Sequence, residues 1–235
     1  MTQNPVVLIG TLALASLVPF ILAAGSCFIK FSVVFSLLRN AIGLQQVPSN
    51  LTLNGLALIM SAFVMMPIIN QAQQYYYENQ VDFANPASTQ AFFEEGLAPY
   101  RRYLARYADP DLVNFFSSLR DAQLREDPNE TYSSPGTRSS DYEPEPVDIE
   151  QASLMTLLPA YALSELKSAF KIGFYIYLPF LVIDMLVSNI LLALGMMMMS
   201  PITISLPIKL ILFVLMDGWN KVVKGMILQY IDLAT

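Results

Sequence analysis

Several ionisable side chains of this sequence stand in apolar surroundings, where a charge needs a partner. A helical projection of residues 158–172 places Glu165 on an otherwise apolar face, whereas the two lysines of that stretch project to the opposite side. Lys209 stands within the apolar run 206–211. Since burying either charge alone is costly, a Glu165–Lys209 ion pair is our leading hypothesis. The alternative is that Glu165 reaches a wet surface or a helix terminus.

Asp184 lies in the longest apolar run of the chain, with Ser188 one helical turn later. An ionisable residue in such a run marks an ion pair or a proton relay. We favour structural pairing, with Lys30 as a candidate partner, over proton chemistry.

Four consecutive methionines, Met196 to Met199, follow Gly195 and precede Ser200 and Pro201. Successive side chains of a helix point about 100° apart, so the run predicts a helix end or loop rather than a helical stripe. Methionine is flexible and uncharged, and a ring of such loops could close a pore to ions yet deform around an extended chain. The alternative is that the run fills an irregular core.

Most familiar enzyme sites are excluded by composition. The chain has no histidine and one cysteine, Cys27, which rules out His-based zinc sites, Ser-His or Cys-His nucleophile pairs and an intrachain disulfide. We therefore expect no catalytic residue, metal or cofactor. Residues 78–150 carry 15 of the 19 acids and a net charge of −9, and the rest of the chain has no clustered basic patch, so nucleic acid is not an expected partner.

The elements that must position these residues are apolar helices. The hydrophobic content is 54% and the mean hydropathy +0.47, which favours a membrane class. The stretch 5–29 is uncharged, and after a turn at Gly43–Pro48 a second apolar helix is expected over 51–72, forming a hairpin. Apolar sequence returns from 154 to 199, as one bent helix or two, and again over 202–216, before an amphipathic tail.

Between the apolar parts, residues 73–125 have a different character. Phe93, Leu97, Tyr100, Leu104 and Tyr107 recur at spacings of four and three, which predicts an amphipathic helical region. Residues 126–150 are rich in proline and acids and predict a disordered loop. The sequence thus predicts four segments, namely 1–72, 73–125, 126–150 and 151–235. Prolines and charges inside the apolar segments indicate packing against partner chains as well as lipid.

The C-terminal segment carries a series of specific motifs. The stretch 157–174 reads LLPAYALSELKSAFKIGF, and it is followed by LPFLVID at 178–184, ALGMMM at 193–198, PIKL at 207–210 and DGW at 217–219. With these motifs the segment resembles the FliP/SctR family of type III secretion export-gate proteins. The N-terminal part is similar in layout, with KFSVVFSLLR at 30–39. The loop 126–150 carries no family motif.

The resemblance implies an all-α, membrane-associated fold of kinked hairpins that assembles into an oligomeric export gate, with a helical periplasmic region. It implies five copies of this chain, with FliQ/SctS-, FliR/SctT- and FlhB/SctU-type partners, in the bacterial inner membrane, threaded by unfolded proteins in transit. It places the pore gasket on Met196, Met197 and Met198 and an intersubunit salt bridge on Glu165 and Lys209.

The start of the chain lacks the basic region of a signal peptide and is interpreted as retained, and LQY at 228–230 looks like the virulence-associated branch, so an injectisome is favoured over a flagellum. Alternatives are an ion channel or proton-coupled transporter using Asp184 and Glu165 as a relay, and a membrane enzyme. The sequence shows neither the inverted repeats of the former nor the convergent cluster of the latter.

Overall fold

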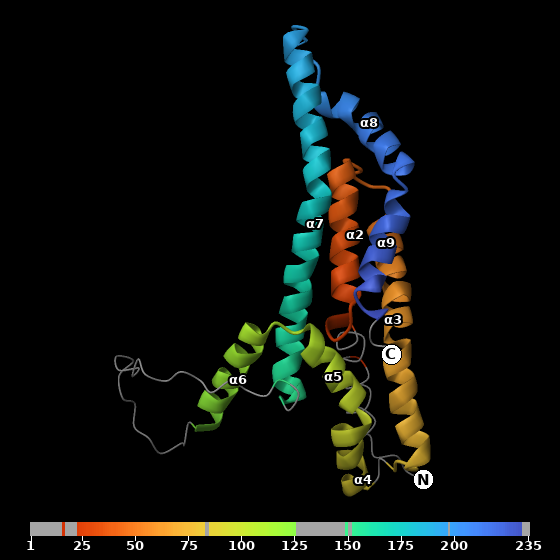
Figure 1. The fold of residues 1–235 in the computed structure, drawn as a ribbon, viewed down its shortest axis with the longest axis vertical. Helices are drawn as coiled ribbons and strands as arrows, with labels where there is room; N and C mark the ends of the chain where they lie inside the picture. Colours follow the sequence, from red (N-terminus) through yellow and green to blue (C-terminus); the bar gives the residue numbers. More distant parts are fainter. Residues whose placement is uncertain are drawn as a thin grey trace, which may run out of the picture. The chain divides into compact units, whose positions relative to one another are not determined.

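The described residues of the chain are entirely helical in their regular structure (Figure 1). The structure is a computed structural model, and it describes Ser16, 23–82, 85–125, Ile149, 152–196 and 198–231. The predicted loop 126–150 lies outside the described residues except for Ile149. Of the predicted helix 5–29 the structure describes Ser16 and 23–29, and there a turn at Gly25–Cys27 precedes a helix that begins at Phe28, so the prediction of one helix through 29 is wrong at this end. The chain divides into two compact units, one of the residues up to Pro67 together with those from Leu166 onward, the other Ile68–Glu165.

Helices α2 (Phe28–Ile42) and α3 (Asn50–Glu78) form an antiparallel hairpin. Ser61 donates to Ser26 at 3.0 Å, and Ser32 donates to Asn54 at 2.7 Å, so residues later in α2 meet residues earlier in α3. The turn between them begins at Gly43, which has φ 96° and which confirms the predicted Gly43–Pro48 turn. Because α2 starts at Phe28, Lys30 and Arg39 are helical residues, and both are buried.

Helix α7 (Leu154–Ala193) is a single helix of 40 residues, which answers the question left by the sequence of one bent helix or two. Gly173 lies where α7 meets α2, and a Cβ atom added there would stand 2.2 Å from Leu37 Cδ1. A glycine at this place in the helix allows the close approach of the two elements. By length and composition α3 and α7 can each cross a membrane.

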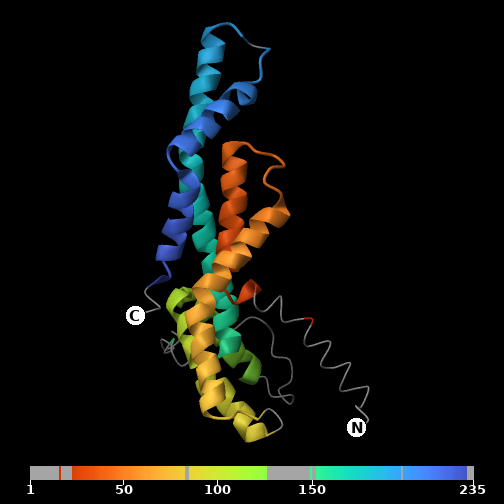
Figure 2. The same ribbon diagram turned by 90° about the vertical axis from the view of Figure 1, so that its right-hand side faces the viewer.

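Helix α8 (Pro201–Leu215) returns from the end of α7 and meets the C-terminal end of α2, and α9 (Gly218–Leu228) then runs alongside α2 (Figures 1 and 2). They are bent by 58° at a short break, and as one broken segment they would make a third candidate span. The core between α2, α7 and α8 is apolar and is formed by Leu38, Ala41, Ile42, Phe180 and Phe213. Trp219 of α9 packs on it, edge-on to Phe213.

The second unit contains α4 (Pro86–Ala91), the π-helix η1 (Phe92–Gly96), α5 (Ala98–Tyr107) and α6 (Pro110–Arg125), with the adjoining parts of α3 and α7. Tyr103 and Tyr161 are fully buried, and their hydroxyl groups hydrogen-bond to each other. The Ser164 hydroxyl accepts from the backbone N–H of Asp109 at 2.7 Å, which fixes the junction of α5 and α6 on α7. Burial raises the pKa of Tyr100 to about 12, because the charged phenolate is disfavoured away from water.

The amphipathic stripe predicted over 93–107 is not one helical face. The π-helix interrupts it, and the wider turn of a π-helix changes the direction in which later side chains point. Tyr103 and Leu104 are the fully buried residues of α5, whereas Phe93 is exposed. The helical class of the region was predicted, but not the phase of its buried face.

Candidate functional site

The methionine run forms the turn between α7 and α8. Helix α7 ends at Ala193, where Gly195 has φ 74° and the Met196 N–H reaches back to the Leu191 carbonyl at 2.9 Å. These are the features of a glycine C-cap, which ends the helix and turns the chain. Pro201 then occupies the first position of α8, where its missing N–H costs no hydrogen bond. The predicted position of the run beyond a helix end is confirmed for Met196, Met198 and Met199, and Met197 lies outside the described residues.

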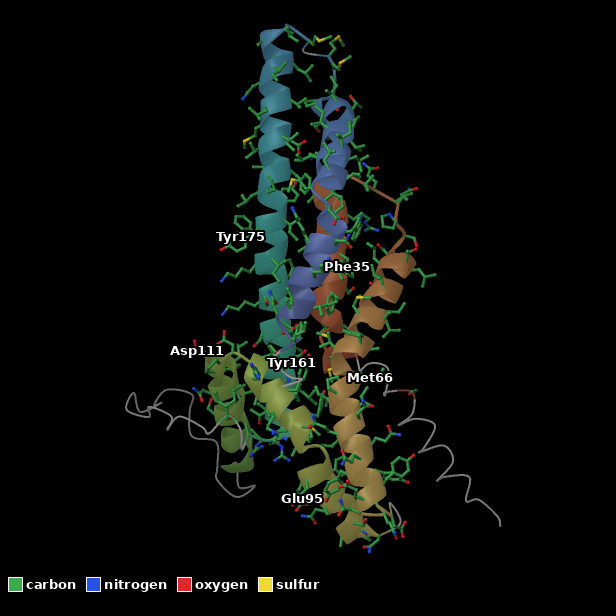
Figure 3. All side chains as sticks on the ribbon, turned by 45° about the vertical axis from the view of Figure 1, so that its right-hand side comes forward. Phe35, Met66, Glu95, Asp111, Tyr161 and Tyr175 are labelled. Atoms are coloured by element: carbon green, nitrogen blue, oxygen red, sulfur yellow. The ribbon has the colours of Figure 1, made fainter. Side chains whose placement is uncertain are left out.

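The described methionines of this turn do not fill the core of their own chain. Met198 is 102% exposed, and Met196 and Met199 are each 45% exposed, whereas Met226 of α9 is buried. Figure 3 shows sulfur atoms standing clear of the helices at the turn. The core-filling alternative therefore fails for these three residues, and their thioether side chains are available to another chain or to a lumen.

Below the turn, Lys209 of α8 is buried, with 6% of its surface exposed. Its Nζ atom lies 2.5 Å from Oδ2 of Asp184 on α7 and donates to the backbone carbonyl of Ala41 on α2 at 3.4 Å. The side chain of Asp184 is 37% exposed, so the pair is only partly shielded from solvent. One ammonium group thus joins three helices.

The Ala41 carbonyl is open to Lys209 because of how α2 ends. At the Gly43 cap, the N–H of Leu44 bonds the carbonyl of Arg39 and the N–H of Gly43 bonds that of Asn40, each at 3.1 Å. The next carbonyl, that of Ala41, is among those at a helix C-terminus that lack an intrahelical partner. A cation is also favoured there by the negative end of the helix dipole.

The Asp184–Lys209 pair is centred on the methionine turn. Asp184 lies twelve residues before Met196, and Lys209 lies twelve residues after Met197. One helical turn farther from the tip, Phe180 and Phe213 pack with ring centroids 6.4 Å apart, and they are also equidistant from the same centre. Two contacts of different chemistry therefore define one antiparallel register of α7 and α8.

Lys30 is also buried, with 3% of its surface exposed, and it is bound to residues near the C-terminal end of the chain. Its Nζ lies 4.7 Å from the centroid of the Tyr230 ring and donates to Gln229 Oε1 at 3.4 Å. Phe31 also packs on Tyr230. The proposed partnership of Asp184 with Lys30 is wrong, because Asp184 is paired with Lys209.

Glu165 is 2% exposed and belongs to the second unit, whereas Lys209 belongs to the first. Its burial confirms that the carboxylate interrupts a packed face and excludes the wet-surface alternative within the chain. The bridge between Glu165 and Lys209 was predicted to join neighbouring subunits, and it stays a prediction. Among the described residues, no group of three His, Cys, Asp or Glu side chains could hold a metal ion.

Sequence reasoning did not identify three features of this site: the Ala41 carbonyl, the Phe180–Phe213 contact and the binding of Lys30 by Gln229 and Tyr230. A backbone carbonyl cannot be recognised as a partner from residue types. The register of α7 and α8 could have been predicted, because Asp184 and Lys209 are equidistant in the sequence from the midpoint between Met196 and Met197.

The helices that hold the site expose much apolar surface. On α7, Tyr175, Leu186 and Ile190 are exposed, and Figure 3 shows Tyr175 projecting outward. On α8, Ile211 and Val214 are exposed in the same way. A surface of this extent belongs against lipid or other protein chains rather than water.

Comparison with known proteins gives the same family over nearly the whole chain. Residues 11–226 match the FliP family. Surface presentation of antigens protein SpaP of Salmonella typhimurium is 53% identical over 232 residues, 99% of each chain. Yop proteins translocation protein R of Yersinia pestis is 46% identical over 95% of each chain, and Harpin secretion protein HrcR of Erwinia amylovora is 39% identical over 92% of each. The family resemblance inferred from the motifs is confirmed.

Proposed function

Because this chain belongs to the FliP family, we propose that it is a core export-gate subunit of a virulence-type type III secretion system. It is a non-enzymatic component of the apparatus that carries proteins across the bacterial inner membrane. Relatives of similar length are named for protein translocation and protein secretion, which supports this assignment.

The observation that carries the proposal is the exposed methionine turn at the end of a helical hairpin, which the partly buried Asp184–Lys209 ion pair holds together. Met196, Met197 and Met198 form the seal of the pore. Their unbranched thioether side chains exclude hydrated ions, because an apolar constriction does not stay wet. The same side chains adapt to an extended polypeptide of varied sequence.

The pore is formed by several copies of the chain, in a ring of five, together with FliQ/SctS-, FliR/SctT- and FlhB/SctU-type subunits. The exposed apolar faces of α7 and α8 support this assembly, since one chain alone leaves them uncovered. The complex lies in the inner membrane, with the helices of 73–125 on the periplasmic side. Unfolded proteins pass through its centre.

Neighbouring copies are joined by the Glu165–Lys209 bridge. A lysine ammonium has three N–H donors, and Asp184 and Ala41 account for two of those on Lys209. The third is available to a carboxylate of the next copy. A buried carboxylate such as that of Glu165 is stabilised at an interface by such a cation.

The seal is tested by replacing Met196, Met197 and Met198 with alanine in the assembled complex. Resting membranes that contain this variant should leak small ions, because the apolar constriction widens, while the subunits still assemble. The matched control is Met155→Ala, which changes an exposed methionine outside the turn. A variant that assembles and conducts no more than the control would exclude the seal.

A further inference from the structure

We infer that Asp184 is the positioning residue of the methionine turn, and that it acts through Lys209 to fix how far the turn extends beyond α2. The inference rests on the proposed function of the turn as a seal, and it assigns to Asp184 a role distinct from that of Glu165. Lys209 then serves two carboxylates: that of Asp184 sets the geometry within the chain, and that of Glu165 holds the ring.

The register of α7 against α8 decides where the tip lies. Sliding one helix past the other by a single turn moves its residues by about 5.4 Å. Aliphatic side chains such as those of the buried Val187 and Leu191 make non-directional contacts, which specify a register less sharply than an ion pair does. An ion pair with its nitrogen and oxygen atoms 2.5 Å apart has no equivalent partner one turn away.

The hairpin of α7 and α8 is also bound to a third helix, α2. Lys209 donates to the Ala41 carbonyl at the C-terminal end of α2, so the pair fixes α8 relative to α2 as well as to α7. The Phe180–Phe213 contact supports this arrangement from the side away from the turn. On the side toward the turn, the ion pair is the last charged contact before Met196.

Asp184 is suited to this role because only one of its oxygens is used. Oδ2 binds Lys209, while Oδ1 is buried and has no hydrogen-bond partner among the described residues. A buried acceptor without a partner costs free energy, and an asparagine here would keep such an oxygen while losing the negative charge that binds Lys209. The pairing with Lys209 supplies the compensating interaction.

The test measures the position of the turn directly. Spin labels are attached through Asn40→Cys, at the exposed end of α2, and Met198→Cys, at the exposed tip, with the buried Cys27 replaced by alanine. Labelled chains are diluted with unlabelled chains in the assembled complex, so that the distance within one chain is read. When Asp184 and Lys209 are both unchanged, the two labels should give one narrow distance distribution.

Asp184→Asn should shift that distribution by several Å or broaden it, toward the roughly 5 Å displacement of a one-turn slip. In unlabelled complexes that keep Met198, the same substitution should raise ion leak. Met185→Leu, a change at the adjacent exposed residue, should alter neither. Exchanging the charges by Asp184→Lys with Lys209→Asp should restore part of the narrow distribution, since the pair returns but the donor to Ala41 is lost. If the distance distribution of Asp184→Asn has the same width and the same mean as that of the Met185→Leu control, the inference is overturned.

A lone buried lysine could prevent Asp184→Asn from folding. The double variant Asp184→Asn with Lys209→Met has no unpaired charge, and it should show the same broad distribution; a narrow one there also overturns the inference. Failure of the seal itself gives a different pattern, in which the methionine-to-alanine variant does not leak although Asp184→Asn still moves the turn.

Discussion

The ammonium group of Lys209 lies 2.5 Å from the carboxylate of Asp184, at the point where α7, α8 and the end of α2 meet. Both residues were recognised in the sequence as charges in apolar runs, and each compensates for the other within one chain. A second carboxylate, that of Glu165, is buried elsewhere in the chain. Substitutions at the two carboxylates should therefore have different effects: those at Asp184 on the geometry within one chain, and those at Glu165 on the contact between copies.

Reversing charge at Glu165 should disrupt the oligomer. Glu165→Lys places a cation where the bridge requires an anion, and a native mass measurement of the solubilised complex should show loss of the full ring. Lys209→Glu should be more severe, because it also sets a carboxylate against Asp184 and the Ala41 carbonyl. The paired reversal should recover assembly in part.

Adding Asp184→Lys to the paired reversal provides the control for this design. The triple variant restores opposite charges both within the chain and between copies, and it should assemble better than the paired reversal. If the paired and triple reversals are both no better than Glu165→Lys alone, the bridge between subunits does not exist.

Adding one methyl group at Gly173 should destabilise the packing of α7 on α2. The new Cβ atom would stand 2.2 Å from Leu37 Cδ1, and overpacking of this kind costs about 1–3 kcal/mol. Thermal unfolding in detergent should show a lower midpoint for Gly173→Ala, and adding Leu37→Ala should recover part of the loss. Gly225→Ala is the matched control, because nothing lies within 4 Å of its added Cβ atom. Equal behaviour of the two variants would contradict the close approach.

Much of the helical fold could be predicted from the sequence, because runs of apolar residues ended by glycine and proline mark where helices begin and end. The turn after Gly195 is such a case. The phase of the helices near Phe93 could not be predicted, since a π-helix shifts it and no residue type requires a π-helix. The local sequence pattern therefore predicts that a segment is helical better than it predicts which face of the helix is buried.

The candidate site was predicted as a set of residues but not as a set of contacts. Asp184, Lys209 and Lys30 were each identified because a charge in an apolar run requires compensation. Their partners depend on tertiary register: Lys30 is bound by Gln229 and Tyr230, about 200 residues away in the chain. One of these partners is an aromatic ring, which has no formal charge by which the sequence could have indicated the pairing.

The C-terminal end of the chain should contribute to stability through Tyr230. Its ring packs on Phe31 and lies under the Lys30 ammonium, and Tyr230 itself is buried. Tyr230→Ala removes both contacts, and losing a large buried side chain costs about 3–5 kcal/mol. Tyr230→Phe keeps the ring face and should recover most of that loss in thermal unfolding. A Tyr230→Ala chain as stable as the Phe variant would show that the ring is not a structural support.

Oxidation of the methionine turn should open the seal without any mutation. Hydrogen peroxide transfers one oxygen atom to a thioether, which becomes a sulfoxide as the peroxide is reduced to water. Met198 is 102% exposed and should react before the buried Met226, which peptide mass spectrometry can resolve residue by residue. The polar sulfoxide binds water, so peroxide-treated complexes should leak ions, and methionine sulfoxide reductase with a thiol reductant should restore the barrier.

The control replaces the methionines of the turn with leucine, which is apolar, of similar volume and inert to peroxide. This variant should remain tight under the same treatment, although exposed methionines elsewhere, such as Met155, are still oxidised. Leak that rises equally in the leucine variant would assign the effect to another site. A complex that stays tight although Met198 is fully oxidised would show that the apolar character of this turn does not maintain the barrier.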